Sequence, residues 1–312
     1  MDIPNQRSSH ETPVPRGGGV GILLGLFAGW ASLRTDLTGF DLYLLLGILI
    51  IAVVGLFDDM KGGLSPLLRL VAQSCAALII LLPAGGMSCL PLPAPLSFHL
   101  HWLSIPLGLI WIVGVTNIYN FLDGIDGYAG VQGLICGVAL FVVLWPAQNS
   151  LFFLCLAGGC LGFLFHNWQP ARIFMGDAGS ASLGFIFGVA PFVVSKTGQG
   201  KAGVTWLVAM FLWFFLSDGL FTILKRVCKR EKIWEAHRSH LYQRLVKSGA
   251  SHSKVVVGVM IPALALSILA GWAWKNRDPA WMWIVFALAF LAFGIYWFVV
   301  TAVEKRVAAD GG

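Results

Sequence analysis

The chain carries little charge for its length. Only 12% of its 312 residues are Asp, Glu, Lys or Arg, against roughly 25% in ordinary soluble domains. Apolar residues make up 57%, and the mean hydropathy is +0.79. So few charges cannot cover the apolar surface that such a chain would present to water. The composition therefore excludes a soluble globular enzyme, a disordered chain and a disulfide scaffold, and it indicates a polytopic membrane protein.

Other features are also missing. The six cysteines form no C-x-x-C motif, which favours the interpretation that they fill apolar helices. Residues 1–19 are polar and rich in Pro and Gly, without the apolar stretch of a signal peptide. No internal repeat of roughly 20–50 residues is visible. A single membrane domain, residues 1–312, is the expected organisation.

Long apolar runs fill most of the chain. They predict an all-α polytopic membrane protein, because a spanning segment must satisfy its own backbone hydrogen bonds in lipid. About ten transmembrane helices are expected, over residues 20–34, 42–57, 66–83, 102–119, 128–145, 150–166, 181–195, 203–223, 254–274 and 280–301.

The basic residues predict the orientation. Ten spans place both termini of this chain on one side, together with segments of about 58–65, 120–127, 167–180 and 224–253. Including 1–19 and 302–312, these segments and the residues beside them hold 16 of the 21 Lys and Arg residues. Because cytoplasmic loops carry the excess of Lys and Arg, this side is predicted to be cytoplasmic. The net charge of +6 then reflects topology and not nucleic-acid binding.

Six carboxylates lie at or just inside the predicted cytoplasmic ends of the spans, where ionisable groups are costly and usually functional. They are Asp58, Asp59, Asp123, Asp126, Asp177 and Asp218. The first five come from three distant segments that share one membrane face. This convergence predicts an active site on the cytoplasmic face, although each segment alone is also typical of a charged helix cap or a polar loop. Asp218 is expected to form a buried structural pair with Thr222.

The first segment combines acids with a helix start. Adjacent Asp58 and Asp59 repel each other unless a cation or hydrogen-bond donors compensate. Ser65 and Pro66 predict the N-cap and first position of the next helix, which carries Arg69 in its first turn.

Oxygen donors gather in the second and third segments. Asn117, Asn120 and Asp123 recur every three residues and lie on neighbouring faces of a helix end. Asp177 follows Gly176 and precedes a helix whose N-terminus favours an anion. Hard oxygen ligands of this kind suit Mg²⁺ held together with phosphates.

A basic loop supplies the fourth segment. His237, Arg238, His240 and Arg244 predict phosphate contacts. A zinc site is the weaker interpretation, since no Cys or acidic ligand stands at a matching spacing. The chain also has no Cys or Ser nucleophile with a base beside it. Together, the four segments predict Mg²⁺-assisted phosphoryl transfer between a soluble and a lipid substrate.

Two alternatives stay open. A CDP-alcohol phosphatidyltransferase would carry D-x-x-D-G-x-x-A-R, whereas Asp126-Gly127 is followed here by Tyr-Ala-Gly. A membrane transporter would place its acids along a pathway, whereas these acids cluster at one interface.

Five stretches resemble the polyprenyl-phosphate N-acetylhexosamine-1-phosphate transferases, of the glycosyltransferase family 4 type. They are DIPNQRSSHETPVPRGGG (2–19), GLFDDMKGGLSPLLRLVAQ (55–73), NIYNFLDGIDGYAG (117–130), NWQPARIFMGDAGSASLG (167–184) and HRSHLYQRL (237–245). The resemblance implies transfer of a sugar 1-phosphate from a UDP-N-acetylhexosamine to undecaprenyl phosphate with release of UMP. It also implies dependence on Mg²⁺, for which Mn²⁺ substitutes.

The resemblance assigns roles to individual residues. Asp177 matches the metal ligand of the family. The catalytic group that it implies comprises Asp58, Asp59 and Asp126, with one of the first pair deprotonating the lipid phosphate. The substrate-binding group comprises Asn120, Asp123, Asn167, Arg69, His237, His240 and Arg244.

The loop at 237–245 differs from the His triplet of the phospho-MurNAc-pentapeptide translocase and is similar to the O-antigen-initiating branch. A UDP-GlcNAc or UDP-FucNAc donor is therefore expected, with a product that begins O-antigen or a related surface polysaccharide. The expected location is the bacterial inner membrane, in contact with membrane lipid and with both termini of this chain cytoplasmic; a homodimer is left open. Family members usually carry one more helix before the DIPNQRSSH stretch. In the present sequence this stretch begins at residue 2, and we therefore expect the additional helix to be absent from it.

Overall fold

The structure, a computed structural model, describes residues 13–33, 39–147, 149–194, 201–231 and 238–310. Within these ranges it is helical and contains no β-strand. The helices are α1 (Gly18–Leu33), α2 (Gly39–Lys61), α3 (Pro66–Ala84), α4 (Ser104–Phe121), α5 (Tyr128–Leu144), α6 (Ser150–Asn167), α7 (Asp177–Val194), α8 (Lys201–Phe211), α9 (Trp213–Cys228), α10 (Leu241–Lys247), α11 (His252–Asn276) and α12 (Pro279–Asp310).

The expected all-α membrane fold is confirmed. Among the described residues, six helices are long and apolar enough to cross a membrane, and the bent α8–α9 pair raises this to seven. Three shorter apolar helices, α1, α5 and α7, complete the bundle. Each of the ten apolar runs coincides with one of these helices or, for residues 203–223, with the bent pair.

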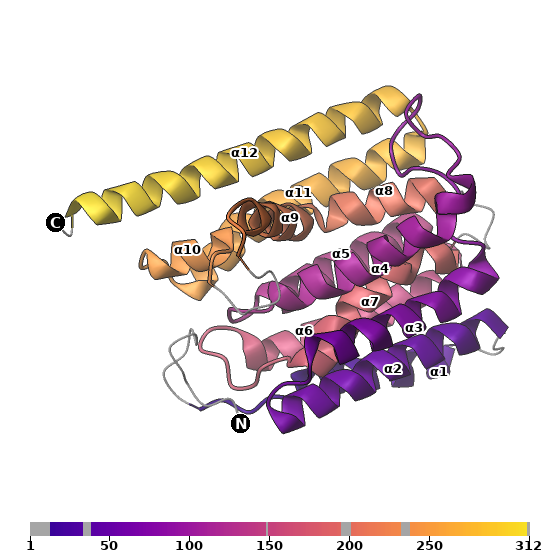
Figure 1. Cartoon of the computed structure of the whole chain (residues 1–312), viewed down its shortest axis with the longest axis horizontal. Coiled ribbons are helices and arrows are strands. Elements are labelled where there is room, and N and C mark those ends of the chain that lie inside the picture. Colours follow the sequence, from indigo (N-terminus) through magenta and orange to yellow (C-terminus); the bar gives the residue numbers. More distant parts are fainter. Residues whose placement is uncertain (1–12, 34–38, 148, 195–200, 232–237, 311–312) are drawn as a thin grey trace.

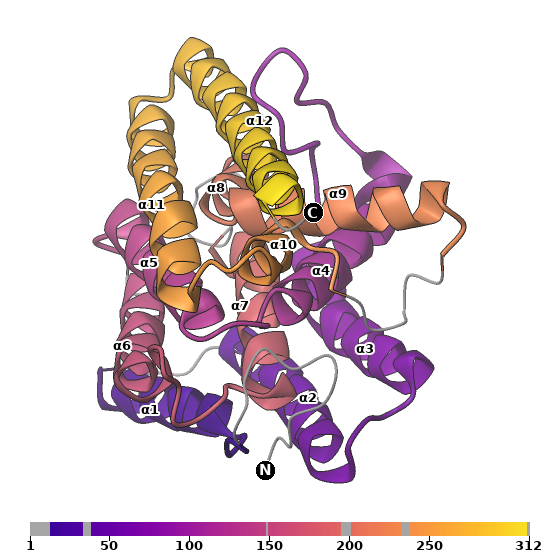
Figure 2. The ribbon, with the colours of Figure 1, turned by 90° about the vertical axis from the view of Figure 1, so that its left-hand side faces the viewer.

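The eighth predicted span is not one straight helix. α8 and α9 meet at an angle of 80°, and α9 runs across the bundle instead of along it (Figure 2). The side chains of α9 differ between its two faces. Phe215 and Asp218 are buried, whereas Leu220 and Leu224 on another face are more than half exposed. One face therefore packs on the protein while the other is left to the surroundings.

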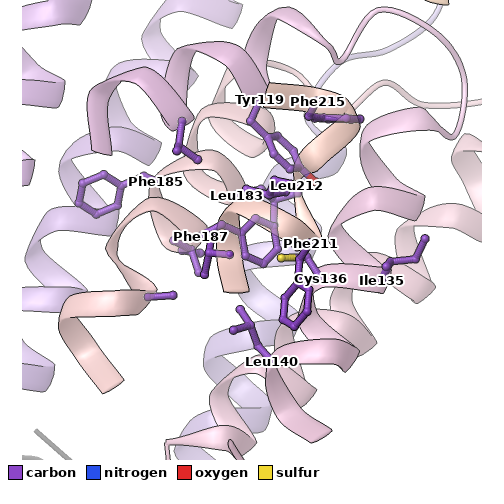
Figure 3. Close-up of a cluster of buried hydrophobic side chains, with 14 of the residues drawn as sticks. Tyr119, Ile135, Cys136, Leu140, Leu183, Phe185, Phe187, Phe211, Leu212 and Phe215 are labelled. Carbon is purple, nitrogen blue, oxygen red and sulfur yellow. The ribbon is translucent and has the colours of Figure 1, made fainter. Parts of the chain in front are cut away.

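The helix α7 lies in the centre of the fold. Residues 178–193 are all buried, and α7 packs against α2, α4 and α8. Gly184 permits the close approach of α4, since a Cβ there would lie 2.8 Å from the Cα of Thr116. Figure 3 shows the aromatic part of this core, where Tyr119 of α4 lies near Phe187 of α7 and Phe215 of α9. This packing fixes the position of Asp177, the first residue of α7.

The two ends of the bundle differ. The short helix α10 and the C-terminal end of α12 lie at one end, and the loop between α3 and α4 lies at the other (Figure 1). The carboxylate-bearing loops belong to the first end, because Tyr242 of α10 donates from its hydroxyl to the carbonyl of Phe121, at the end of α4, over 3.2 Å.

Candidate active site

The N-terminus of α7 is capped by a carboxylate from another helix. Asp59, near the end of α2, accepts the backbone N–H of Asp177 on Oδ1 at 2.9 Å and that of Ala178 on Oδ2 at 3.1 Å. Gly176 turns the chain into α7 with a φ of +76°, and a Cβ there would lie 2.5 Å from Asp59 Oδ2. Both oxygens of Asp59 are therefore engaged in holding Asp177 in place.

The start of α1 is hydrogen-bonded to the same region. Gly18 donates its N–H to the carbonyl of Phe174 at 2.9 Å, and Gly19 donates to that of Met175 at 2.9 Å. The preceding Arg16 places Nη1 4.0 Å from Asp59 Oδ1. Sequence reasoning did not single out Arg16, although it lies within the first of the family stretches. Its guanidinium adds positive charge beside the cap.

Arg69 lies between two carboxylates from different helices. Its Nη1 is 3.3 Å from Asp177 Oδ2 and 3.7 Å from Asp58 Oδ2. Asp58 also accepts the backbone N–H of Leu64 in the turn that follows α2. Ser65 caps α3 as expected, accepting from the N–H of Leu68 at 3.3 Å. The cation offsets the repulsion that the acids would otherwise experience.

Amides from α4 complete the surroundings of Asp177. Asn120 Nδ2 donates to Asp177 Oδ1 at 3.2 Å and to Ser180 Oγ at 2.8 Å. One turn earlier, Asn117 exchanges hydrogen bonds of 2.6 and 3.3 Å with Gln73 of α3. Gln73, Asn117, Asn120 and Asp177 line a cleft between α2, α3, α4 and α7.

Asp123 differs from its neighbours. It lies in the short loop between α4 and α5, and its carboxylate forms no hydrogen bond or ion pair with the described residues. Burial, together with the charges of Asp177 and Asp59, raises its pKa to about 7. A carboxyl with this pKa and no protein partner is available to a cation or a ligand.

Asp126 and Asn167 connect loops. Asp126 Oδ2 accepts the N–H of Ala171 at 3.1 Å and lies 3.3 Å from Nδ1 of His252, at the start of α11. Asn167 accepts the N–H of Gly127 at 2.8 Å and donates to the carbonyl of Ile173 at 2.9 Å. Both side chains hold the loops after α4 and α6 together. The sequence singled out these two residues but missed His252, which directly follows the Ser251 N-cap of α11.

Part of the basic loop is organised by Asp218. This fully buried residue of α9 accepts the N–H of Leu241 at 2.9 Å and the hydroxyl of Thr222 at 3.2 Å, and it lies 3.3 Å from Nδ1 of His240. The expected pairing of Asp218 with Thr222 is therefore confirmed. The carboxylate also caps α10, which sequence reasoning did not predict. His240 is buried and points at Asp218.

Arg244 faces a carboxylate instead of open solvent. Its Nε donates to Glu304 Oε1 of α12 at 2.8 Å, and Nη2 donates to Oε2. Hydrogen bonding to Glu304 raises the pKa of Arg244 above its ordinary value. His237, the remaining residue of this loop in the predicted substrate-binding group, lies outside the described residues.

The donor set suits an ion such as Mg²⁺, which shares its ligands between protein and substrate, better than a metal ion bound by protein side chains alone. In the part of the chain that the structure describes, no three His, Cys, Asp or Glu side chains are grouped as a metal site. Mg²⁺ usually binds one or two carboxylates and takes its remaining ligands from substrate phosphates and water. Asp177 and Asp58, whose carboxylates lie beside each other and both approach Arg69 Nη1, meet that requirement.

Comparison with known proteins gives consistent matches. Residues 42–195 match Glycosyl transferase family 4. The chain is 31% identical over 282 residues to a probable undecaprenyl-phosphate N-acetylglucosaminyl 1-phosphate transferase of Bacillus subtilis, covering 86% of this chain and 76% of that protein.

Two further relatives are similar over most of their length. A decaprenyl-phosphate N-acetylglucosaminephosphotransferase of Mycobacterium tuberculosis is 31% identical, with 89% of this chain and 77% of the relative covered. A phospho-N-acetylmuramoyl-pentapeptide-transferase of Synechococcus is 33% identical, with 85% and 76% covered.

Proposed function

The chain belongs to glycosyl transferase family 4, among its polyprenyl-phosphate hexosamine-1-phosphate transferases, and on that premise we propose that it transfers an N-acetylhexosamine 1-phosphate from a UDP-sugar to undecaprenyl phosphate. UMP is the second product. The proposal rests above all on one observation: Arg69, Asn120 and Asp177, from three distant segments, line one cleft. Asp58 lies beside this cleft, 3.7 Å from Arg69 Nη1.

The proposed step is a direct displacement at phosphorus. An oxygen of undecaprenyl phosphate forms a bond to the β-phosphorus of the UDP-sugar, and the bond from that phosphorus to the bridging oxygen breaks. UMP leaves with the bridging oxygen and the electron pair. A phosphate monoester is largely ionised at pH 7, so a base adds little. A two-step route through a phosphoryl-aspartate is the alternative mechanism.

The residues of the cleft suit this step. Mg²⁺, with Mn²⁺ as a substitute, would be held by Asp177 and Asp58 and would reduce the repulsion between phosphates and stabilise the leaving UMP. Arg69 lies where a phosphate oxygen can accept from its guanidinium. Asn120 orients Asp177, and Asp123, close enough to Asp177 and Asp59 for their charges to raise its pKa, offers a further carboxyl.

Finer parts of the proposal follow from the loop HRSHLYQRL, and the names of two relatives agree only with the N-acetylglucosamine donor. We propose a UDP-GlcNAc or UDP-FucNAc donor and a product that begins O-antigen or a related surface polysaccharide. We also propose a location in the bacterial inner membrane, with the cleft and both termini of this chain on the cytoplasmic side. The excess of Lys and Arg on that side supports the orientation.

The test is UMP release from UDP-GlcNAc in membranes supplied with undecaprenyl phosphate and Mg²⁺. Asp177→Asn is expected to lower the rate at least roughly 100-fold, since a metal ligand contributes several kcal/mol to catalysis. Asp310→Asn, an exposed acid at the end of α12, serves as the control. Full turnover by Asp177→Asn at equal expression would overturn the metal assignment.

Other outcomes separate the alternatives. Sugar uptake without UMP release would identify a transporter, and CMP release from a CDP-linked lipid would identify a phosphatidyltransferase. Trapping of a phosphorylated aspartate would establish the two-step route in place of direct displacement.

A further inference from the structure

A second cavity lies between α5 and α11, away from the carboxylate cleft. These helices run side by side in both views of the bundle (Figures 1 and 2). The cavity has a volume of about 510 Å³. Its wall consists almost entirely of aliphatic and aromatic side chains, including Val138 and Val142 of α5 and Leu264, Ile268 and Trp272 of α11. All five are at least 40% exposed. The cavity therefore opens toward the lipid phase and is lined for an apolar occupant.

One end of this cavity carries a fixed positive charge. Lys275, near the end of α11, donates from Nζ to the carbonyl of Val142 at 3.0 Å. An ammonium has three N–H donors, so two are left for a ligand. Arg277 follows directly after α11. Trp272 and Trp281 pack edge to face at 5.0 Å beside this end, as is typical of a membrane–water interface.

The position of this end is fixed by the fold. α11 begins at His252, which contacts Asp126 of the carboxylate region, and Lys275 lies near the other end of the same 25-residue helix. The charged rim therefore lies at the far end of the bundle from the cleft. A ligand here would occupy the opposite side of the membrane from the proposed reaction.

The shape of the cavity favours a chain over a helix. α5 and α11 already touch beside it, since a Cβ on Gly271 would lie 2.9 Å from Val143 Cγ2. The cavity is thus a slot between touching helices. A helix with its side chains is roughly 10 Å across, whereas an acyl chain is a single file of methylene groups that follows an irregular slot.

We propose that this cavity binds one acyl chain of an anionic phospholipid, with the lipid phosphate held by Lys275. The apolar wall recognises the chain, and the ammonium recognises the headgroup. The site is separate from the cleft in which the transferase reaction is proposed, and it does not depend on that function.

Native mass spectrometry of the full-length protein in detergent tests the proposal. The protein is titrated with dioleoyl-phosphatidylglycerol or, separately, with dioleoyl-phosphatidylethanolamine. One retained lipid is expected, with preference for the anionic one. Lys275→Gln is expected to reduce that preference about fivefold, because one Lys contributes about 1 kcal/mol to binding at an anionic surface. Lys254→Gln, an exposed lysine at the other end of α11, is the matched control.

A second pair of variants tests the slot itself. Ile268→Trp fills the cavity and is expected to abolish lipid retention. Ile261→Trp adds the same bulk at an exposed position of α11 outside the cavity and should retain the lipid. Equal retention of lipid by Ile268→Trp and Ile261→Trp would overturn the proposal. Equal affinity of the wild type for phosphatidylglycerol and phosphatidylethanolamine would also overturn it. Loss of a dimer in Ile268→Trp, with no bound lipid in the wild type, would instead identify a contact between two copies.

Discussion

The cap that Asp59 provides leads to a sharp prediction. Sequence reasoning places Asp59 in the catalytic group, whereas in the structure both of its oxygens accept the first N–H groups of α7. A residue that positions Asp177 should tolerate replacement by another good N-cap, and Asn caps about as well as Asp. A general base should not tolerate this change, since its loss lowers rates roughly 10²–10⁴-fold.

The expected magnitudes follow from the two hydrogen bonds. Asp59→Asn keeps one acceptor and loses the favourable charge at the helix N-terminus, which amounts to about 1 kcal/mol and a rate loss below roughly tenfold. Asp59→Ala leaves both N–H groups without this acceptor. It should destabilise the N-terminus of α7 by about 2 kcal/mol and raise the Mg²⁺ concentration needed for half-maximal rate.

The assay is UMP release as a function of Mg²⁺ and of pH, with thermal unfolding in detergent to confirm folding. A positioning role predicts that Asp59→Asn keeps the shape of the pH profile and shifts it only slightly toward lower pH, because the charge of Asp59 contributes to the raised pKa of Asp123. Equal losses of more than 100-fold in well-folded Asp59→Asn and Asp59→Ala would refute the reasoning and restore Asp59 as a base or nucleophile.

Three further predictions concern other parts of the structure. The raised pKa of Asp123 means that the folded, metal-free protein binds its proton more tightly than the unfolded chain does, so stability falls as pH rises through about 7. The free energy of unfolding should be about 1 kcal/mol lower at pH 8 than at pH 6, and Asp123→Asn should remove this difference in thermal melts. Asp218→Ala should lower stability by about 3 kcal/mol, because it leaves the buried start of α10 without its acceptor; an unchanged melting temperature would contradict the cap. Chelation of divalent metal should abolish UMP release and leave the helix content by circular dichroism unchanged, whereas unfolding on chelation would indicate a structural metal.

Hydropathy was sufficient to place the helices, because each long apolar run must satisfy its backbone within the membrane. The Ser65 cap and the meeting of Asp58, Asn120 and Asp177 also follow from local signals and topology. The sequence could not tell which of two adjacent aspartates would meet the N-terminus of α7. That choice depends on the rotation of α2 against α7, which is set by packing.

Contacts between residues that are far apart in the sequence could not be predicted either. Arg244 has a phosphate-binding pattern in the sequence, and its partner Glu304 lies 60 residues later on α12. The family resemblance assigned Asn167 to substrate binding, whereas in the structure its donor and acceptor both meet loop backbone. The bend after α8 also escaped the hydropathy pattern, since both halves are apolar.

The two helix caps supplied by other helices have a consequence for biosynthesis. Asp59 is made 118 residues before the N–H group that it accepts, and Asp218 is made 23 residues before that of Leu241. In each pair the acceptor is synthesised before the helix whose first turn it caps. α7 therefore inserts beside a helix that carries the acceptor for its first turn, and the proposed metal ligand is in place only once the earlier helices have assembled.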